Sequence, residues 1–538
     1  MVGSPIGLFD LIETFLIMIK RAEQVNRLNA QTHDVLVIGG GINGACCAAS
    51  LAVAGMKVCL VERGDFASQT SQESSNLVWG GIKYLQSGSI FLVHKLCRSR
   101  NELIRSYPSS VQEIPYFTCL QKSSPSRLLF YLGTWIYWFL GRCFTAMPRL
   151  LSLSEVREVA GGESVGGVEY SDAYLPDNDA RFTFQFIRAA WRAGALAVNY
   201  AEAGKSRRLD GQWITKVYDL TTGSEHEVRS GMIINAAGPM VDEVNALNQI
   251  DTNSRIVFSK GVHLIVPRLS ELDRVMTFFA RDGRLFFAVP MGSCSCIGTT
   301  DTPQDDWKSE VTSEDIEFIL ENINLQMGLT NPLTQKDIIA TRCGVRPLAV
   351  AKGASYQGDW VHLSRRHVTE VDRVNQYVSI YGGKLTDCVN VGNEARAICQ
   401  GFGYRFKHGP WYGEDEGREA FLSKVASLGR DRINESEGFA PCLWRRYGRD
   451  ASKILEMMKQ DPELGHEVVE GSGVLWVEVR YAADHEMVEQ LEDFLRRRTR
   501  LSLCHRLSEY EGVLSKIAYT LFGDQGEKKK SEYLSAEN

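Results

Sequence analysis

A glycine-rich segment near the amino terminus has the spacing of a nucleotide-binding turn. Residues 39–44 read Gly-Gly-Gly-Ile-Asn-Gly, which fits the pattern Gly-x-Gly-x-x-Gly. In that pattern the first glycine makes a tight turn, the second lets the backbone approach a pyrophosphate, and the third allows a helix to pack closely. Glu62 follows at the spacing from which a carboxylate reaches ribose hydroxyls. These residues predict a dinucleotide site, and they do not distinguish NAD from FAD.

Hydroxyl side chains gather shortly after this segment. Thr70, Ser71, Ser74 and Ser75 could bind the phosphates or the sugar chain of a cofactor, or could form ordinary turns and helix caps. We favour cofactor contacts for some of them. Asp301, in the run Thr-Thr-Asp-Thr, has similar alternatives, because its carboxylate could bind a ligand or accept hydrogen bonds from a tight turn.

A strand, a helix and a second strand must position the glycine segment. Residues 34–38 are β-rich, residues 43–54 are small and suit a helix, and residues 57–61 form the next strand, which ends at Glu62. Gly55 ends the helix as a C-terminal glycine does. Parallel strands joined by a helix belong to a sheet covered on both faces, so this opening predicts an α/β nucleotide domain.

Later segments indicate that this domain is discontinuous. Residues 232–234 and 378–381 look like strands that return to the first sheet. Residues 112–188 and 256–338 are richer in strand-like and aromatic runs. We therefore assign these two segments to a substrate domain inserted into the nucleotide domain.

The carboxy-terminal part has a helical pattern from Arg418 onward, which includes residues 487–495 and 503–522. Residues 526–538 are charged and small, which favours a solvated tail. The arginine run 496–498 predicts a solvated face, with acidic lipids or a partner domain as the alternative. The predicted boundaries are an N-terminal extension over 1–31, the nucleotide and substrate region over 32–400, a helical domain over 401–525 and the tail over 526–538.

Composition limits the class of protein. A chain of 538 residues is too long for one compact core, so two or three domains are expected. A charged fraction of 23% and a net charge of −6 are ordinary for a globular protein and argue against nucleic-acid binding. The 13 cysteines lack the spacing of metal ligands or of a disulfide framework, so we expect no metal site and free thiols in a reducing compartment.

One strongly apolar run raises the question of a membrane. Residues 128–140 are apolar and aromatic, and they are shorter than the roughly 20 residues that span a bilayer. The run could be a buried helix or could lie on a membrane surface, and we favour burial. Residues 7–19 are apolar but carry Asp10 and Glu13, with no basic residue ahead of them, so they do not resemble a signal peptide.

Residues 70–85, which read Thr-Ser-Gln-Glu-Ser-Ser-Asn-Leu-Val-Trp-Gly-Gly-Ile-Lys-Tyr-Leu, resemble the second signature of the FAD-dependent glycerol-3-phosphate dehydrogenases. That family belongs to the D-amino-acid-oxidase-like flavoproteins. The likeness extends in order from residue 34 to residue 500, and this order is more specific than any single match. The resemblance implies an α/β fold with a Rossmann-like FAD-binding domain, an inserted α+β substrate domain and a C-terminal helical domain. The further matching segments are 179–181, 260–263, 298–303, 344–348, 364–365, 382–386, 478–482 and 492–500.

The resemblance also implies a substrate site. Arg346 and Arg365 look like the family's phosphate-binding arginines, and a guanidinium can donate two parallel hydrogen bonds to a phosphate. Lys83 and Tyr84 match another pair that contacts the substrate. Lys83 stands where arginine is common in the family, so we expect a point charge there in place of bidentate binding.

Two further residues receive roles in the reaction from the same resemblance. His263 is the leading candidate for the proton acceptor, because imidazole titrates near neutral pH. Lys384 is expected beside the flavin ring, where a cation stabilises the anionic reduced form; together with Arg346 these are the expected catalytic residues. The expected cofactor contacts are Gly39, Gly40, Gly41, Asn43, Gly44, Glu62, Arg63, Thr70, Ser71, Ser74, Ser75, Gly81, Ala237, Gly238, Gly383, Lys384, Leu385 and Thr386.

The function that this resemblance implies is oxidation of sn-glycerol 3-phosphate to dihydroxyacetone phosphate, with FAD as cofactor and quinone or oxygen as the electron acceptor. A related flavoprotein that oxidises a 2-hydroxy acid or an amino acid is one alternative, and a flavin-binding scaffold without turnover is another. We expect a cytoplasmic protein with peripheral contact to the inner face of the cell membrane, and we leave a homodimer open.

Overall fold

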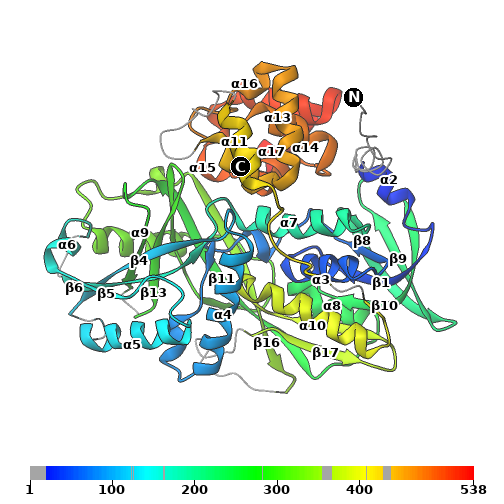
Figure 1. Cartoon of the computed structure of the whole chain (residues 1–538), viewed down its shortest axis with the longest axis horizontal. Helices are drawn as coiled ribbons and strands as arrows, with labels where there is room; N and C mark the ends of the chain where they lie inside the picture. Colours follow the sequence, from blue (N-terminus) through cyan, green and yellow to red (C-terminus); the bar gives the residue numbers. More distant parts are fainter. Residues whose placement is uncertain are drawn as a thin grey trace, which may run out of the picture.

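The computed structural model contains two large sheets and a helical domain (Figure 1). In that view the nucleotide-binding sheet lies on the right, the second sheet on the left and the helical domain above both. The predicted α/β fold with a helical C-terminal part is confirmed. The structure describes residues 20–122, 124, 126–160, 164–280, 283–353, 366–406, 409–427 and 438–537.

The first sheet has a parallel centre. Strands β18, β10, β1, β2 and β7 run parallel in that order, and β17 and the β8–β9 hairpin extend the sheet with antiparallel pairs. The predicted strand, helix and strand around the glycine segment are therefore present, as are the two returning strands. The strands are β1 (Thr32–Ile38), β2 (Val58–Val61), β7 (Leu196–Val198), β8 (Ala201–Leu209), β9 (Gln212–Asp219), β10 (Glu225–Asn235), β17 (Val368–Asp372) and β18 (Tyr377–Tyr381).

Helices cover one face of this sheet and a hairpin covers the other. The helices α3 (Ile42–Val53), α7 (Asp179–Arg192) and α10 (Cys388–Gly401) pack side by side, since the small residues of α3 let both neighbours approach closely. On the opposite face, β8 and β9 pack over the central strands together with the segment that follows α2 (Arg21–Asn26). Arg21 is buried there and pairs with Asp219 at 2.7 Å, so part of the expected N-terminal extension belongs to this core.

The second sheet is mostly antiparallel and is organised around its longest strand, β11, which pairs with β14, β15 and β16. Helix α9 (Ser313–Met327) covers it. Two elements differ from the expected insertion: α7, inside 112–188, packs on the first sheet, and β16, beyond residue 338, belongs to the second. The strands are β3 (Leu77–Val78), β4 (Gln112–Gln121), β5 (Arg149–Leu151), β6 (Ser164–Tyr174), β11 (Ser254–Pro267), β12 (Val275–Phe279), β13 (Leu285–Met291), β14 (Cys294–Gly298), β15 (Thr302–Gln304) and β16 (Ala340–Ala351).

The C-terminal domain is helical but differs locally from the predicted pattern. Residues 487–490 are not helical, and residues 493–498 form a π-helix, η9. The tail expected to be solvated is instead helix α17, which packs on α16 and buries Tyr533. The other helices are α11 (Arg418–Ser427), α12 (Phe439–Tyr447), α13 (Ala451–Gln460), α14 (Trp476–His485), α15 (Leu501–Cys504), α16 (Glu511–Phe522) and α17 (Gly526–Glu537).

A buried ion-pair cluster joins this domain to the nucleotide domain. Asp65, which follows β2, accepts hydrogen bonds from Arg497 and Arg498 at 2.7 Å each. The prediction of a solvated arginine face is therefore wrong for these two residues, whose side chains are almost fully buried. Burial would raise the pKa of the Asp65 carboxyl, but the two arginines outweigh it and lower that pKa.

The apolar run of residues 128–140 forms helix α5 (Arg127–Leu140), and the preference for burial was wrong. The side chains of Thr134 and Tyr137 are buried, whereas Leu129 and Phe139 are 66% and 63% exposed. The reason is that α5 rests on the protein along one narrow stripe, where the Tyr137 hydroxyl donates to the buried Asp172. No helix in the described part of the chain is long and apolar enough to cross a bilayer.

Replacing Asp65 should strongly destabilise the protein. In Asp65→Asn the buried charge of Arg498 loses its carboxylate partner, and Arg497 keeps its pairs with Asp493 and Glu492. We therefore expect a loss of about 3 kcal/mol in the apparent free energy of unfolding. Circular dichroism during denaturant unfolding measures this loss. Glu227→Gln, which removes an exposed pair with Arg207, is the control and should leave the midpoint unchanged. An unchanged midpoint for Asp65→Asn would contradict this account.

Candidate active site

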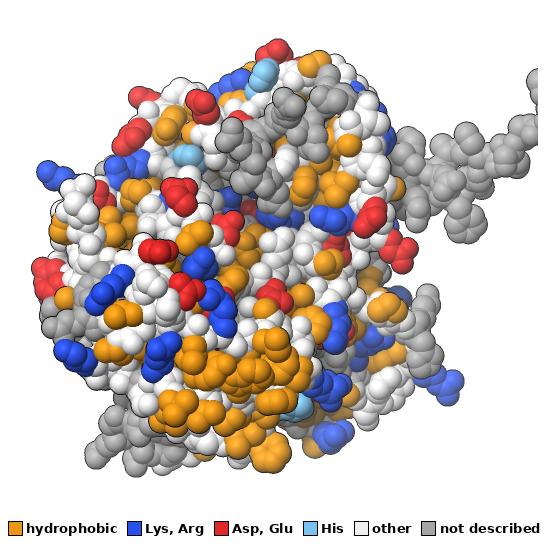
Figure 2. All heavy atoms as spheres, turned by 60° about the vertical axis from the view of Figure 1, so that its left-hand side comes forward, with side chains coloured by type: hydrophobic (Ala, Val, Ile, Leu, Met, Phe, Trp, Pro, Cys, Tyr) orange, Lys and Arg blue, Asp and Glu red, His pale blue; other side chains and the backbone are white. Residues whose placement is uncertain are grey.

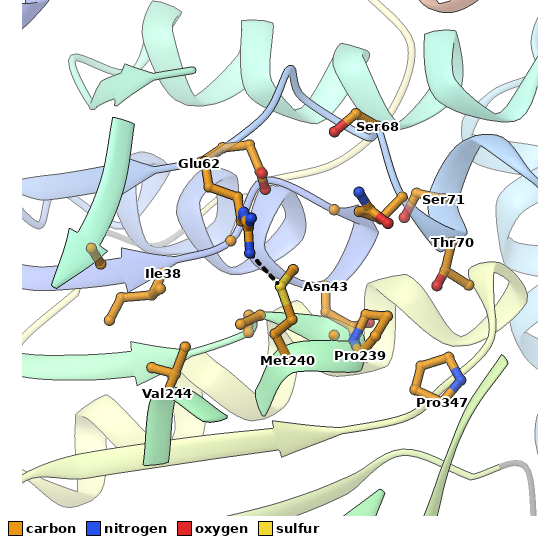
Figure 3. A pocket seen from close by; sticks show the side chains of 18 of the residues that line it. Ile38, Asn43, Glu62, Ser68, Thr70, Ser71, Pro239, Met240, Val244 and Pro347 are labelled. Atoms are coloured by element: carbon orange, nitrogen blue, oxygen red, sulfur yellow. Dashed lines mark hydrogen bonds between the residues drawn. The ribbon is translucent and has the colours of Figure 1, made fainter. Parts of the chain in front are cut away.

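A first cavity of about 370 Å³ opens at the carboxyl ends of β1, β2 and β10 (Figure 3). This is where ligands bind in open α/β sheets. Figure 3 shows Glu62 on one side of the cavity, Met240 and Val244 on the other, and Thr70 and Ser71 towards the end at which Pro347 lies. Arg63 donates to the sulfur of Met240 at 3.0 Å and thereby helps to close the wall.

The glycine segment folds as its spacing predicts. Gly39 has a φ of 106°, and a Cβ atom there would lie 2.5 Å from the carbonyl oxygen of Ala236. A Cβ atom on Gly44 would overlap with the carbonyl group of Gly39. Glycine at both positions therefore lets α3 begin directly at the ends of β1 and β10.

The amino terminus of α3 is built to receive an anion. Gly41 lines the cavity and bears no side chain, so a ligand can approach the backbone N–H groups there. Ser71 accepts a hydrogen bond from the N–H of Ile42 at 3.0 Å. Asn43 donates to the carbonyl of Gly382 at 2.9 Å, and its Oδ1 atom is buried with no hydrogen-bond partner in the described part of the chain. The open helix terminus fits the pyrophosphate of a dinucleotide, whereas Asn43 Oδ1 is an acceptor and suits a hydrogen-bond donor of the ligand.

Glu62 is held by backbone donors at the other end of this cavity. Its two carboxylate oxygens accept hydrogen bonds from the N–H groups of Gly40 at 2.6 Å and Gly64 at 2.8 Å. Burial raises the pKa of this carboxyl, and the two backbone donors partly oppose that effect. Each oxygen keeps a second lone pair, so the fixed carboxylate can also accept hydrogen bonds from ribose hydroxyls.

A second cavity of about 470 Å³ adjoins the first. Ile42, Thr70, Ser71, Pro347 and Gly383 line both cavities, so the two form neighbouring parts of one site. A cofactor whose phosphates lie at α3 would therefore place its other half in the second cavity. This arrangement fits FAD, which carries a ring system at the end opposite its adenosine.

Cationic side chains converge on the second cavity. Lys83, Lys384 and Arg346 line it, and the register of β11 and β16 explains the place of Arg346. A Cβ atom on Gly261 would overlap with the Arg346 guanidinium, so the glycine provides the space that this group occupies. Arg346 donates to Thr299 Oγ1 at 2.9 Å and contacts Asp301 at 3.4 Å, which fixes its plane.

His263 lies two residues after Gly261 on β11 and also lines the second cavity, because alternate residues of a strand face the same side. Its side chain is buried, and its Nδ1 atom has no hydrogen-bond partner among the described residues. Burial, with smaller contributions from Arg346 and Arg342, holds the pKa of His263 well below its ordinary value. The ring is therefore neutral near pH 7 and able to accept a proton.

Aromatic residues that the sequence analysis did not assign to the site complete the wall. Trp79 and Phe287 line the cavity and meet edge to face, with ring centroids 6.0 Å apart. The Lys384 ammonium lies 4.3 Å from the ring centroid of Tyr84. Trp79 lies inside the 70–85 signature, so the sequence could have indicated that it belongs to the site. Phe287 lies in an ordinary strand pattern, which gives no such indication.

The structure brings most of the predicted site residues together. Gly40, Gly44 and Gly81 line neither cavity but shape the turns beside them, and Arg365 lies outside the described residues. The first cavity is lined by Gly39, Gly41, Asn43, Glu62, Arg63, Thr70, Ser71, Ala237, Gly238 and Gly383. The second is lined by Thr70, Ser71, Ser74, Ser75, Lys83, Tyr84, His263, Arg346, Gly383, Lys384, Leu385 and Thr386.

Known proteins share this arrangement. A family model described as FAD dependent oxidoreductase matches residues 34–370, and one described as C-terminal domain of alpha-glycerophosphate oxidase matches residues 410–522. Glycerol-3-phosphate dehydrogenase 2 of Mycobacterium tuberculosis is 32% identical over 511 residues, covering 90% of this chain and 83% of the relative. The chain belongs to the FAD-dependent glycerol-3-phosphate dehydrogenase family.

Other members of this dehydrogenase family cover most of the chain as well. The mitochondrial glycerol-3-phosphate dehydrogenase of Bos taurus is 29% identical over 524 residues, which are 90% of this chain and 69% of the relative. The X-ray structure of the glycerol-3-phosphate dehydrogenase from Bacillus halodurans complexed with FAD superposes with a TM-score of 0.73, covers 97% of both chains and is 23% identical. It shows that the whole fold is shared.

Glu62→Gln should weaken FAD binding. The amide nitrogen of glutamine would face the N–H of Gly40 or Gly64, so we expect release of FAD about tenfold faster than from the unaltered protein. Flavin fluorescence after dilution measures this release. Glu225→Gln, an exposed residue outside both cavities, is the matched control. A Glu62→Gln protein that releases FAD at the unaltered rate would rule out this role for the carboxylate.

Proposed function

We propose that the chain oxidises sn-glycerol 3-phosphate at C2 to dihydroxyacetone phosphate and passes the electrons to a membrane quinone. The observation that carries this proposal is the second cavity, in which four cations and a neutral histidine adjoin the flavin part of the site. The family relationship supports the same substrate.

The cations suit a phosphate dianion. Arg346 can donate two parallel hydrogen bonds, and its plane is fixed by Thr299 and Asp301 before any ligand arrives. Lys83 and Lys384 add point charges to the lining of the same cavity, and both lie against the ring of Tyr84. A phosphate held by these groups fixes the attached carbon chain, which places C2 at a constant distance from the flavin ring.

Removal of the hydroxyl proton requires a base. His263 is neutral because of its burial and of Arg346, so a ring nitrogen can take the proton from the C2 hydroxyl as the carbon loses its hydride. FAD, when bound, supplies the acceptor for that hydride. The nearby guanidinium opposes an imidazolium, so the proton must leave His263 again after each turnover.

A 2-hydroxy acid or an amino acid is the second candidate substrate, because its carboxylate could also bind Arg346. The balance of charge favours the phosphate. Four cations (Lys83, Arg284, Arg346 and Lys384) line the cavity against two carboxylates (Glu73 and Asp301), and a phosphate dianion neutralises more of this positive excess than a singly charged carboxylate does. An amino acid would also bring an ammonium group into this cationic cavity.

Anaerobic mixing tests the substrate. The purified flavoprotein is mixed with sn-glycerol 3-phosphate, lactate or glycine while flavin absorbance is recorded. We expect bleaching with glycerol 3-phosphate alone. Bleaching only with lactate or glycine would show that the substrate is a 2-hydroxy acid or an amino acid. No bleaching with any of the three compounds would favour a flavin-binding scaffold.

Arg346→Lys and His263→Gln should separate binding from proton transfer. The first variant loses the bidentate contact, so we expect the half-saturating substrate concentration to rise about tenfold. The second loses the base, so we expect the rate of flavin reduction to fall by about 10²-fold or more at saturating substrate. Stopped-flow absorbance gives both quantities. Arg207→Lys, an exposed change, serves as control, and two variants with identical defects would contradict the assigned roles.

We also propose that helix α5 rests on a lipid surface. Figure 2 shows hydrophobic side chains gathered on the face of the molecule that carries this helix, with basic side chains near the edge of the patch. Ile90 and Phe91, at the start of α4 (Ile90–Ser106), are also exposed, Phe91 by 87%. A helix of this length with leucines on its exposed face and tryptophans along it suits the membrane interface better than water.

The same surface suits a quinone as electron acceptor. Phe130 of α5 packs edge to face on Phe279, with ring centroids 5.9 Å apart, and Phe279 lines the second cavity. Leu285 and Phe287 continue this apolar lining towards Trp79. The apolar side chains that connect α5 with the wall of the second cavity suit the docking of a lipid-borne quinone.

The exposed leucines of α5 should determine vesicle binding. For Leu129→Glu/Leu132→Glu we expect at least a tenfold loss of binding to phosphatidylglycerol vesicles, because two charges replace the apolar contact. Co-sedimentation measures the bound fraction. The control is Leu209→Glu/Leu220→Glu, which changes two leucines of similar exposure in the nucleotide domain. Equal loss in both variants, or no binding by the unaltered protein, would contradict the proposed surface.

A further inference from the structure

A buried histidine that has no place in the proton transfer lies behind the loop that joins the two cavities. The loop, Gly382–Thr386, lines both cavities through Gly383 and presents Lys384 to the second. His367, just before β17, packs against its far side: a Cβ atom on Gly383 would lie 3.2 Å from the Cβ atom of His367. The His367 side chain is only 6% exposed.

Both ring nitrogens of His367 meet carboxylates. Nδ1 lies 2.6 Å from Oδ2 of Asp387, and Nε2 lies 2.6 Å from Oε2 of Glu394. A neutral imidazole donates through only one nitrogen, so two carboxylate partners require both nitrogens to carry protons. Burial would lower the pKa of His367, but the hydrogen bonds to Asp387 and Glu394 outweigh it and raise the pKa to about 9.

The partners connect the imidazolium to the loop and to the helix behind it. Asp387 directly follows the loop, and Glu394 lies in α10. Lys95 of α4 pairs with Asp387 at 3.2 Å, and Asn390 donates to the other oxygen of Asp387 at 2.6 Å. Among the described residues, the charges that face the ring are the two carboxylates, with Lys95 beyond Asp387, and the imidazolium supplies the second positive charge that balances them.

We propose that His367 is a positioning residue for the flavin: as an imidazolium held between Asp387 and Glu394, it fixes the Gly382–Thr386 loop against FAD. The inference rests on the FAD site and on the proposed function, in which this loop holds Lys384 beside the flavin. The loop is tied to α3 through Asn43, which donates to the carbonyl of Gly382. His367 provides a second attachment, through Asp387 at the end of the loop.

The proposal implies a dependence on pH with a definite sign. The pKa of His367 is higher in the folded protein than its ordinary value of 6.5, so its contribution is complete below about pH 6.5 and is lost as the pH rises through about 9. Above that pH a nitrogen lone pair faces one of the two carboxylates. The loop then loses its rear attachment, and FAD should be held less firmly.

Release of FAD from the holoenzyme tests this. Flavin fluorescence after dilution is followed from pH 7 to pH 10 for the unaltered protein and for His367→Gln, with His226→Gln, a partly exposed histidine outside both cavities, as control. We expect release from the unaltered protein and the control to accelerate about tenfold across pH 9. His367→Gln should release FAD about tenfold faster at pH 7 and show no such step.

Glu394→Gln provides a second variant should His367→Gln fail to fold, since Glu394 is 42% exposed and its loss removes one of the two carboxylates. We expect its step in FAD release to move below pH 9. A step that is unchanged in either variant, or absent from the unaltered protein, would overturn the proposal. FAD release involves no substrate, so a step at pH 9 without bleaching by glycerol 3-phosphate would uphold His367 while rejecting the proposed substrate.

Discussion

The absence of side chains at Gly39 and Gly44 is the constraint on which the rest of the site depends. It lets the first turn of α3 lie against the ends of β1 and β10, where any Cβ atom would collide with a carbonyl group. The helix terminus, the carboxylate of Glu62 and the Ser71 hydroxyl therefore share one small volume. Phosphates bound at this helix terminus would direct the other half of FAD into the adjoining second cavity.

The second sheet completes the site by strand register. Alternate residues of β11 face the second cavity, and Gly261 and His263 are two residues apart. The space left by the missing side chain of Gly261 therefore lies beside the imidazole ring of His263. The antiparallel partner β16 supplies Arg346, whose guanidinium fills that volume. Neither strand could do this alone, since the cation comes from one strand and the space for it from the other. The pairing of β11 and β16 thus places the Arg346 guanidinium near His263, whose pKa it helps to lower.

The parts of the site that could be predicted from sequence are those specified by neighbouring residues. The turn at residues 39–44, the strand ending at Glu62 and the serine-rich segment each follow from local spacing. The exposure of helix α5 could not be predicted in this way. An apolar sequence does not reveal whether another element of the fold covers the helix. The burial of Arg497 and Arg498 depends on Asp65, which is distant in sequence, and the two partners of His367 follow from the path of the chain around the loop.

The ion-pair cluster at Asp65 has a consequence for the order of assembly. Asp65 lies next to the turn that carries Glu62, yet its arginine partners belong to the C-terminal domain. On the ribosome, the amino-terminal sheet emerges long before Arg497 and Arg498 are synthesised. Before then the amide of Asn199, in the same domain, can donate to this carboxylate, as it does in the structure at 2.9 Å. The loop after β2 therefore gains its two arginine partners only once the helical domain has docked.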